Sequence, residues 1–553
     1  MSESNPEQKS PTEPLDLARK IEDTLAGRRP FEVNYPYFSP DYKLPFTHIG
    51  TERQLFLDNF MLDWLDGVER VIVTPTKAPE PLLVWTDLPW EQAGFNPGVT
   101  AALQDPEDGL YKLWYWQTLT GDAFNNGQAL CYAESRDALR WEKPLLETGQ
   151  PFQEHRRTNI VLHDVSLSGL VLNPRWREQP DRKFLLLYNP GSEAPARKQR
   201  VLSRVAASPD GIRWTVISDD VPQRHQHEQR IIWDEAIQQF IGYSQYSHHW
   251  HHGPRTRQVG RQTSPDFVHW SPKEVVLSVD WDPTLTPDRE FHEASVRKVG
   301  GLYILIVGEC HTDPLWQVGG NGANWRDQFH VNLALYSSRD GVRFTRAHGP
   351  EPWVDNGPPG SQDHGYACFT AAGALTANGQ SIIPYSAIPV KQWTIDRADK
   401  PVLAPETTRA HLAARYAAAR SFGTDPDATS WRRAVGGLIL REDGYAELRC
   451  RHKAGRVLTK QFVFAGDRLR INADCGFGHA RVELLDPHHQ AYEGFSAADC
   501  DAIHGVGLWH TVTWKGQADV RALWNKPVRL AFHLDDASLF GFEFCSGDVK
   551  HGG

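Results

Sequence analysis

A short turn sequence recurs four times between residues 135 and 344 and decides the fold. It reads SRDALRW at 135–141, SPDGIRW at 208–214, SPDFVHW at 264–270 and SRDGVRF at 338–344. In each copy the Ser and Asp side chains can hydrogen-bond the local backbone and shape a tight turn, and the final Trp or Phe can fill the core between neighbouring units. The copies lie roughly 55 to 75 residues apart, a period that fits four-stranded propeller blades with loops of variable length.

Five aromatic, β-rich segments accompany these turns. They read YKLWYW at 111–116, KFLLLYN at 183–189, QFIGYSQY at 239–246, LYILIVGE at 302–309 and QSIIPYS at 380–386. Each follows an apolar strand after a polar turn, which is the pattern of a β-hairpin. The sequence therefore predicts an all-β fold in which a five-bladed β-propeller occupies residues 51–400, after a partly disordered extension over 1–50.

The pattern changes beyond the propeller. Residues 401–430 read as a linker, in which RAHLAARYAAAR at 409–420 can form a short helix. From 431 to 553 short strands return between Gly, Asp and Pro turns, and they predict a C-terminal β-sandwich of jelly-roll type. This second unit either binds sugar or packs against the propeller.

Composition limits the class of protein. The 553 residues carry 59 Lys and Arg against 69 Asp and Glu, with 40% hydrophobic and 23% charged residues. These values exclude a disordered chain, no apolar run is long enough to span a bilayer, and no basic block favours nucleic acid. Seven scattered cysteines without a CxxC pair, and a polar start without a signal sequence, predict a cytoplasmic protein with reduced thiols. The sequence is compatible with a homo-oligomer.

Two further segments extend the pattern into a family resemblance. Together with the four turns, LFLDNFMLDWLDGVERVIVTP at 55–75 and PLLVWTDLPWE at 81–91 resemble the five-bladed propeller glycoside hydrolase superfamily of invertase/levanase and arabinanase/β-xylosidase enzymes. More narrowly, the chain is similar to uncharacterised bacterial proteins labelled glycosyl hydrolase family 32-like. The resemblance implies an axial funnel in which one carboxyl protonates the leaving oxygen and a second carboxylate lies near the anomeric carbon.

The resemblance also points to individual carboxylates. The segment FHEASVRKVGGLYILIVGE at 291–309 is similar to the one that holds the general acid in the arabinanase/β-xylosidase enzymes, which implies that Glu293 is the proton donor. The alternative is a Glu293 that only pairs with Arg289 or Arg297. Glu309 and Cys310 resemble, less closely, the Glu-Cys pair of invertases.

A second carboxylate is less clearly marked. Asn96 stands where the family has an Asp at the start of the first inner strand, and Asn can be neither nucleophile nor general base. Three acidic residues at corresponding strand starts can take that role, namely Asp164, Glu228 and Asp363. The departure at Asn96 puts the usual mechanism of these families in question.

Histidines and tryptophans supply candidate substrate-binding residues near the strand ends. The histidines are His227, His249, His292 and His364, and the candidate stacking rings are Trp85, Trp90, Trp114, Trp250 and Trp316. Imidazoles can hydrogen-bond sugar hydroxyls or hold a metal, but the HHWHH run at 248–252 lacks a zinc-site spacing, so we expect no cofactor and treat a histidine-held metal as an alternative.

Three functions are compatible with these residues. The first is a glycoside hydrolase that cleaves a soluble oligosaccharide or glycoconjugate, with Glu293 as acid and Asp164, Glu228 or Asp363 as the second carboxylate. The second is a metal-assisted sugar lyase or other sugar-modifying enzyme built on the histidines. The third is a non-catalytic carbohydrate-binding propeller, because fold does not fix function.

Overall fold

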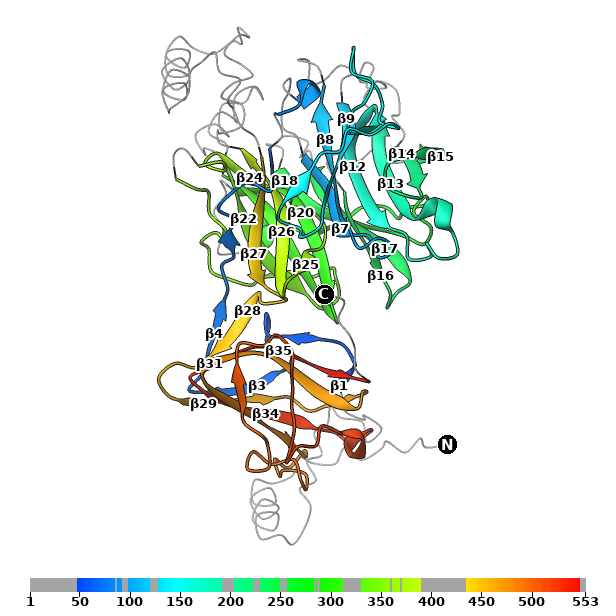
Figure 1. The fold of residues 1–553 in the computed structure, drawn as a ribbon. Helices are drawn as coiled ribbons and strands as arrows, with labels where there is room; N and C mark the ends of the chain where they lie inside the picture. Colours follow the sequence, from blue (N-terminus) through cyan, green and yellow to red (C-terminus); the bar gives the residue numbers. More distant parts are fainter. Residues whose placement is uncertain are drawn as a thin grey trace, which may run out of the picture. The chain divides into compact units, whose positions relative to one another are not determined.

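The computed structural model describes residues 47–84, 87–91, 98–119, 128–190, 203–221, 229–248, 256–282, 285, 289–311, 330–358, 361–368, 370–388 and 434–547. The chain divides after Thr47, and all strands from Gln54 onward belong to the unit His48–Gly553. Apart from short 3-10 turns, the secondary structure of the described residues consists of β-strands (Figure 1). Among these residues no helix is long and apolar enough to cross a membrane.

Four consecutive antiparallel blades have four strands each, in chain order from the first strand to the fourth (Figure 1). Blade 1 contains β7 (Gly98–Gln104), β8 (Tyr111–Thr118), β9 (Gln128–Ser135) and β10 (Trp141–Glu142), with β11 (Ile160–His163) added to β9. Blade 2 contains β12 (Val165–Leu172), β13 (Phe184–Pro190), β14 (Ser203–Ser208) and β15 (Thr215–Val221). Blade 3 contains β16 (Arg230–Asp234), β17 (Gln239–His248), β18 (Thr256–Ser264) and β19 (Glu274–Leu277). Blade 4 contains β20 (Arg289–Val299), β21 (Leu302–His311), β22 (His330–Ser338) and β23 (Thr345–Arg346).

The fifth blade is assembled from distant parts of the chain. Its first position is shared by β24 (Tyr366–Cys368) and β25 (Leu375–Ala377), followed by β26 (Gln380–Ile388) and β27 (Ala434–Arg441). The outer edge comes from the N-terminal strands β5 (Thr76–Lys77) and β6 (Leu83–Val84), which both pair with β27. Residues 434–441, which the sequence boundaries placed in the C-terminal unit, therefore belong to the propeller.

The first strands of the blades form a ring. Strand β12 contacts both β7 and β16, β16 contacts β20, and β25 contacts β7. The remaining junction is made where the Gly373 N–H donates to the Val296 carbonyl at 2.8 Å. Within the described residues, the five-bladed propeller predicted from the repeats is confirmed.

The four recurring turns join the third strand to the fourth in blades 1 to 4. In blade 2, the Asp210 carboxylate accepts hydrogen bonds from the N–H groups of Ile212 and Arg213 at 2.9 and 2.8 Å. The residue after the Asp has a positive φ in all four turns, at Ala138, Gly211, Phe267 and Gly341. Glycine adopts this conformation without strain, which explains its presence in two of the copies.

These turns also lock neighbouring blades together. The Trp114 indole on β8 donates to the Gly211 carbonyl at 2.7 Å, and the Tyr243 hydroxyl on β17 donates to the Gly341 carbonyl at 2.6 Å. Buried apolar clusters fill all five spaces between adjacent blades. The five aromatic segments are the second strands of the blades, so much of the aromatic content of the sequence is used in this packing.

The turn aspartates should make folding sensitive to acid. Burial alone would raise the pKa of Asp210, but the two backbone hydrogen bonds, together with those from the side chains of Arg213 and Ser208, hold the pKa below its usual value. A depressed pKa adds stability above the ordinary Asp pKa of about 3.9, and this stability is lost as the pH falls through the folded-state pKa. Asp210→Asn should therefore flatten the fall of the thermal unfolding midpoint below about pH 4. Equal flattening by Asp219→Asn, an exposed residue on β15, would contradict this explanation.

Most of the remaining strands form a second sheet system around its own core, to which the separate short strand β30 (Phe462–Phe464) also contributes. Its central path runs through β3 (Leu62–Asp66), β29 (Ala454–Thr459), β34 (Arg529–Asp535), β31 (Arg468–Leu485), β35 (Ser538–Cys545), β28 (Ala446–Arg449) and β4 (Glu69–Ile72), as the mixed blue and orange-red strands of Figure 1 show. The short strands β2 (Gln54–Leu55), β32 (Ile503–Gly505) and β33 (His510–Thr511) pair at its margins. Residues 54–72, which the sequence boundaries placed in the propeller, pair with C-terminal strands instead.

Candidate active site

Bulges distort the first strands of three blades near one end. On β20 the ladder passes from Phe291 opposite Glu309 to Glu293 opposite Gly308, so His292 is an extra residue. On β7 the extra residue is Thr100, and on β12 the register shifts between Ser166 and Gly169. A bulge breaks the strict alternation of side chains along a strand, and so it can turn two consecutive side chains toward the same space.

A buried arginine gathers polar groups from the bulged strands. Arg230, the first residue of β16, is 1% exposed at its side chain. Its guanidinium donates to the carbonyls of Thr370 at 2.7 Å and Thr100 at 3.3 Å, and one nitrogen lies 3.8 Å from a carboxylate oxygen of Glu293. These partners belong to blades 5, 1 and 4.

Blade 2 joins the same layer through hydroxyl and backbone contacts. The Ser168 hydroxyl lies 3.0 Å from that of Thr100, and its carbonyl accepts from the Gln229 N–H at 3.3 Å. All five blades thus meet around Arg230. We call Thr100, Ser168, Arg230, Glu293 and Thr370 the axial layer, because they come from the first strands or the segments beside them in every blade.

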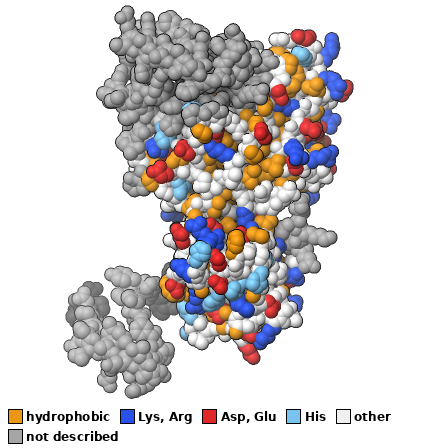
Figure 2. Space-filling model, turned by 60° about the vertical axis from the view of Figure 1, so that its left-hand side comes forward, with side chains coloured by type: hydrophobic (Ala, Val, Ile, Leu, Met, Phe, Trp, Pro, Cys, Tyr) orange, Lys and Arg blue, Asp and Glu red, His pale blue; other side chains and the backbone are white. Residues whose placement is uncertain are grey.

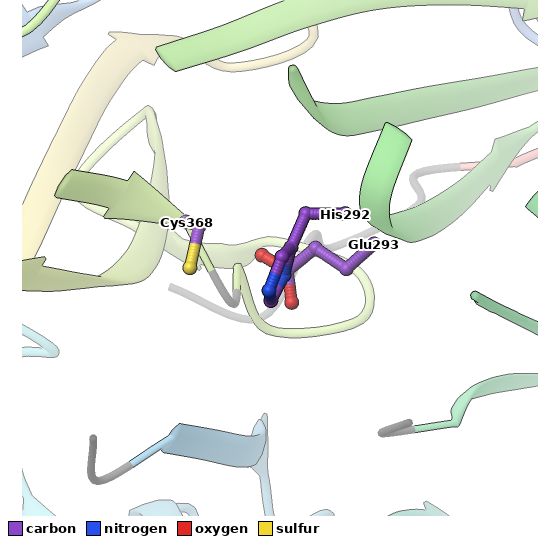
Figure 3. Close-up of side chains that lie close together, drawn as sticks. All are labelled: His292, Glu293 and Cys368. Atoms are coloured by element: carbon purple, nitrogen blue, oxygen red, sulfur yellow. The ribbon is translucent and has the colours of Figure 1, made fainter. Parts of the chain in front are cut away.

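Glu293 shares this region with two other reactive side chains. His292, Glu293 and Cys368 are all buried, and one ligand atom from each lies within 4.8 Å of the other two. In Figure 3 the His292 ring and the Glu293 carboxylate extend in the same direction from β20, toward the space near the Cys368 sulfur on β24. The bulge at His292 therefore makes a cluster that an ordinary strand could not.

The two arginines considered as alternative partners of Glu293 are used elsewhere. Arg289 pairs with Glu309 at 3.1 Å, and Arg297 pairs with Asp443 at 2.6 Å. Glu309 is also bonded to Arg346, and burial raises its pKa against the opposing effect of the two arginines. Glu309 is thus held between two cations, whereas Glu293 faces Arg230 in the axial layer.

Two of the three candidates for the second carboxylate, Asp164 and Asp363, lie in the described part of the chain and differ in their surroundings. Asp164 precedes β12, is partly exposed, and has a φ of 63°. Asp363 is buried before β24 and lies 2.6 Å from the Lys77 ammonium on the outer edge of blade 5. It also accepts from the Tyr385 hydroxyl at 3.0 Å and from Ser361 at 3.2 Å. Asp363 thus connects β5, β26 and the segment before β24 in the fifth blade.

The predicted substrate-binding residues are only partly placed. His364 is half-buried, with its Nδ1 3.0 Å from the Gly357 carbonyl. Trp90 is 2% exposed and donates to Asn159 at 2.9 Å, so it is a core residue with no face for sugar stacking, and Trp114 is likewise buried. Seven predicted residues lie outside the described part of the chain, namely Trp85, Asn96, His227, Glu228, His249, Trp250 and Trp316.

Sequence reasoning missed three members of this region. Arg230 begins an apolar strand only two residues after the predicted Glu228, and a charge at the head of a buried run is the signal that could have found it. Cys368 lies in a segment without a motif. Thr100 has no distinguishing sequence feature, and only the structure shows that it lies in a bulge with its hydroxyl beside that of Ser168.

Surface charge on the described residues is mixed. In the view of Figure 2, Lys and Arg side chains alternate with Asp and Glu, and apolar patches lie between them. Several histidines are visible on the same face.

Comparisons with known proteins give only distant likenesses. No family model matches the chain, and no curated protein matches it. Among solved structures, a variant fructofuranosidase from Schwanniomyces occidentalis complexed with fructosylnystose is 10% identical, covering 86% of this chain and 98% of its own at a TM-score of 0.38. An N-acetylgalactosamine deacetylase from F. plautii is 15% identical, with coverages of 58% and 86% and a TM-score of 0.36.

A third likeness is to a family 117 glycoside hydrolase from Zobellia galactanivorans, at 13% identity, coverages of 58% and 85%, and a TM-score of 0.31. Such low scores do not support a functional assignment. The fold is assigned from the strand pairing of this chain, and its chemistry is proposed from the side chains of the axial layer.

Proposed function

We propose that this protein is a glycoside hydrolase that cleaves a soluble oligosaccharide or glycoconjugate, with Glu293 as the proton donor. The observation that carries the proposal is the position of Glu293, a buried carboxyl beside Arg230 where all five blades meet. A positioned carboxylic acid can protonate a glycosidic oxygen as its bond breaks. The family resemblance of residues 291–309 agrees with this role.

The direct test is release of reducing sugar from a panel of soluble glycans and chromogenic glycosides by the full chain. Turnover of at least one member is expected. Binding across the panel without turnover of any member would contradict the proposal and favour a carbohydrate-binding propeller.

Asp164 is our proposed second carboxylate. It is partly exposed at the start of an inner strand, whereas Asp363 is buried and bound to Lys77, Tyr385 and Ser361. A nucleophile or general base needs a carboxylate oxygen that can turn to substrate or water, and both oxygens of Asp363 are already bound by these three partners. Glu228 keeps its predicted role as a third candidate.

Matched substitutions separate these candidates. Asp164→Asn should lower kcat by about 100-fold while the thermal unfolding midpoint stays near that of the wild type. Asp363→Asn should instead lower the midpoint, because it weakens the ion pair between this buried carboxylate and the partly exposed Lys77. If Asp363→Asn lowers kcat and Asp164→Asn lowers only the midpoint, the role passes to Asp363. Loss of turnover only in Glu228→Gln would assign it to Glu228.

A metal-assisted sugar-modifying enzyme is the second candidate function. The proximity of His292, Glu293 and Cys368 favours it, because these side chains supply nitrogen, oxygen and sulfur ligands. In that reaction a chelator should abolish turnover, whereas the hydrolase reaction proposed above requires no metal.

The proposal also covers the fold of the C-terminal strands and the cellular location of the protein. The C-terminal strands are proposed to form a jelly-roll-like sandwich, supported by the division of β31, which pairs with β35 over its first half and β34 over its second. A cytoplasmic location is proposed because all seven cysteines are buried free thiols. The carbohydrate substrate follows from the proposed reaction, and we propose no nucleic-acid or membrane partner.

A further inference from the structure

The cluster of His292, Glu293 and Cys368 combines three kinds of metal ligand. An imidazole nitrogen, a carboxylate oxygen and a thiol sulfur lie within 4.8 Å of one another, in three side chains that are each at most 3% exposed. Ligand atoms around a tetrahedral ion are separated by somewhat less than this, so small rotations of the side chains would close the site. Two strands of different blades supply the ligands.

The ligand types select the ion. Thiolate and imidazole together favour Zn²⁺ and chemically similar ions, whereas Ca²⁺ and Mg²⁺ prefer oxygen ligands alone. Three protein ligands leave a fourth coordination position open. The cluster therefore has the composition of a zinc site with one exchangeable position.

The surroundings can support such a site. Glu293 has two carboxylate oxygens, so one can bind an ion while the other faces Arg230, whose nearest nitrogen lies 3.8 Å from the carboxylate. Arg230 is itself fixed by the carbonyls of Thr100 and Thr370. A second layer of contacts that orients a metal-binding carboxylate commonly strengthens binding.

We propose that His292, Glu293 and Cys368 bind Zn²⁺, and that the bound ion inhibits the enzyme by occupying the Glu293 carboxylate. The inhibitory part rests on the proposed hydrolase function, and the binding part does not. The site would then make hydrolysis respond to available zinc.

Binding can be tested without any substrate. The full chain, reduced and stripped with a chelator, is titrated with Co²⁺ and followed by thiolate-to-cobalt charge-transfer absorption. One equivalent should saturate the signal, and Zn²⁺ should displace it. Cys368→Ser should abolish the absorption and weaken zinc binding by more than about tenfold, the lower end of the loss seen for outer-shell partners.

Cys310→Ser is the matched control. Cys310 lies in the same apolar cluster as Cys368, but its sulfur faces the Arg257 guanidinium at 3.9 Å. This variant should keep the cobalt signal. Absence of the signal in the wild type, or its persistence in Cys368→Ser with an unchanged unfolding midpoint, would overturn the site.

The effect on turnover is measured separately. Zn²⁺ should inhibit hydrolysis by the wild type at the concentrations that displace cobalt, and at least about tenfold more Zn²⁺ should be needed for Cys368→Ser. Cobalt binding without hydrolysis of any substrate would remove the proposed function and leave the metal site standing. Hydrolysis without cobalt binding would remove the metal site and leave the proposed function standing. Stimulation by Zn²⁺ would overturn the inhibitory role and favour the metal-assisted reaction.

Discussion

Glu293→Gln is expected to lower kcat by about 100- to 10,000-fold, the usual contribution of a positioned general acid. Glutamine has nearly the same shape as glutamate but no proton that it can transfer to a leaving oxygen. The measurement is the initial rate of reducing-sugar release at saturating substrate, together with the thermal unfolding midpoint. A substrate with a good leaving group should lose less, because it needs less protonation.

Glu290→Gln provides the control for this substitution. Glu290 lies on the same strand, is 5% exposed, and pairs with Arg257 at 3.7 Å. It matches Glu293 in residue type and burial but lies outside the axial layer. Full activity in Glu293→Gln, or an equal loss in Glu290→Gln, would remove Glu293 from the role of acid.

Arg230→Met is expected to destabilise the propeller by about 3–5 kcal/mol, the usual cost of removing one partner from a buried ion pair. The substitution leaves the Glu293 carboxylate without its cation and the carbonyls of Thr100 and Thr370 without their donors. Urea unfolding followed by tryptophan fluorescence measures the change.

A double-mutant cycle identifies the cause. If the cost comes from the charge left on Glu293, adding Glu293→Gln to Arg230→Met should recover about 0.5–3 kcal/mol. Strictly additive losses would show that Arg230 acts through its carbonyl contacts alone. A loss below about 1 kcal/mol in the single variant would show that the axial layer does not depend on this arginine.

Local patterns were sufficient to predict the propeller. The turn at 208–214 contains both the aspartate that accepts backbone hydrogen bonds and the glycine that adopts a positive φ, so its conformation is encoded within seven residues. The second strands were equally clear, because alternating apolar and aromatic residues mark a buried hairpin.

The blade boundaries required information from distant residues. Strand β27 has the same apolar character as the strands that come after it, and only its pairing with β26 and β5 assigns it to the propeller. In the same way, β3 and β4 look like the start of the propeller until they pair with β29 and β28. Sequence periodicity shows that a strand exists but does not choose its partner.

Among the residues of the candidate site, Glu293 could be proposed from a sequence motif, whereas the residues that only strand geometry brings beside it could not. Glu293 was found through its resemblance to a family segment, and the structure places it in the axial layer. Arg230 and Cys368 lie on other blades, and nothing in the sequence connects them to Glu293. The bulge at His292 is a feature of strand register, which a single sequence does not reveal.

The composition of the fifth blade has a consequence for synthesis and folding. Its edge is made by residues 76–84, whereas its third strand is not produced until residues 434–441 emerge from the ribosome. Contacts between such distant segments carry a large loop-closure cost and form slowly. The edge strands β5 and β6 are therefore made long before β27, the strand with which they pair, and they stay without this partner until residues 434–441 are synthesised.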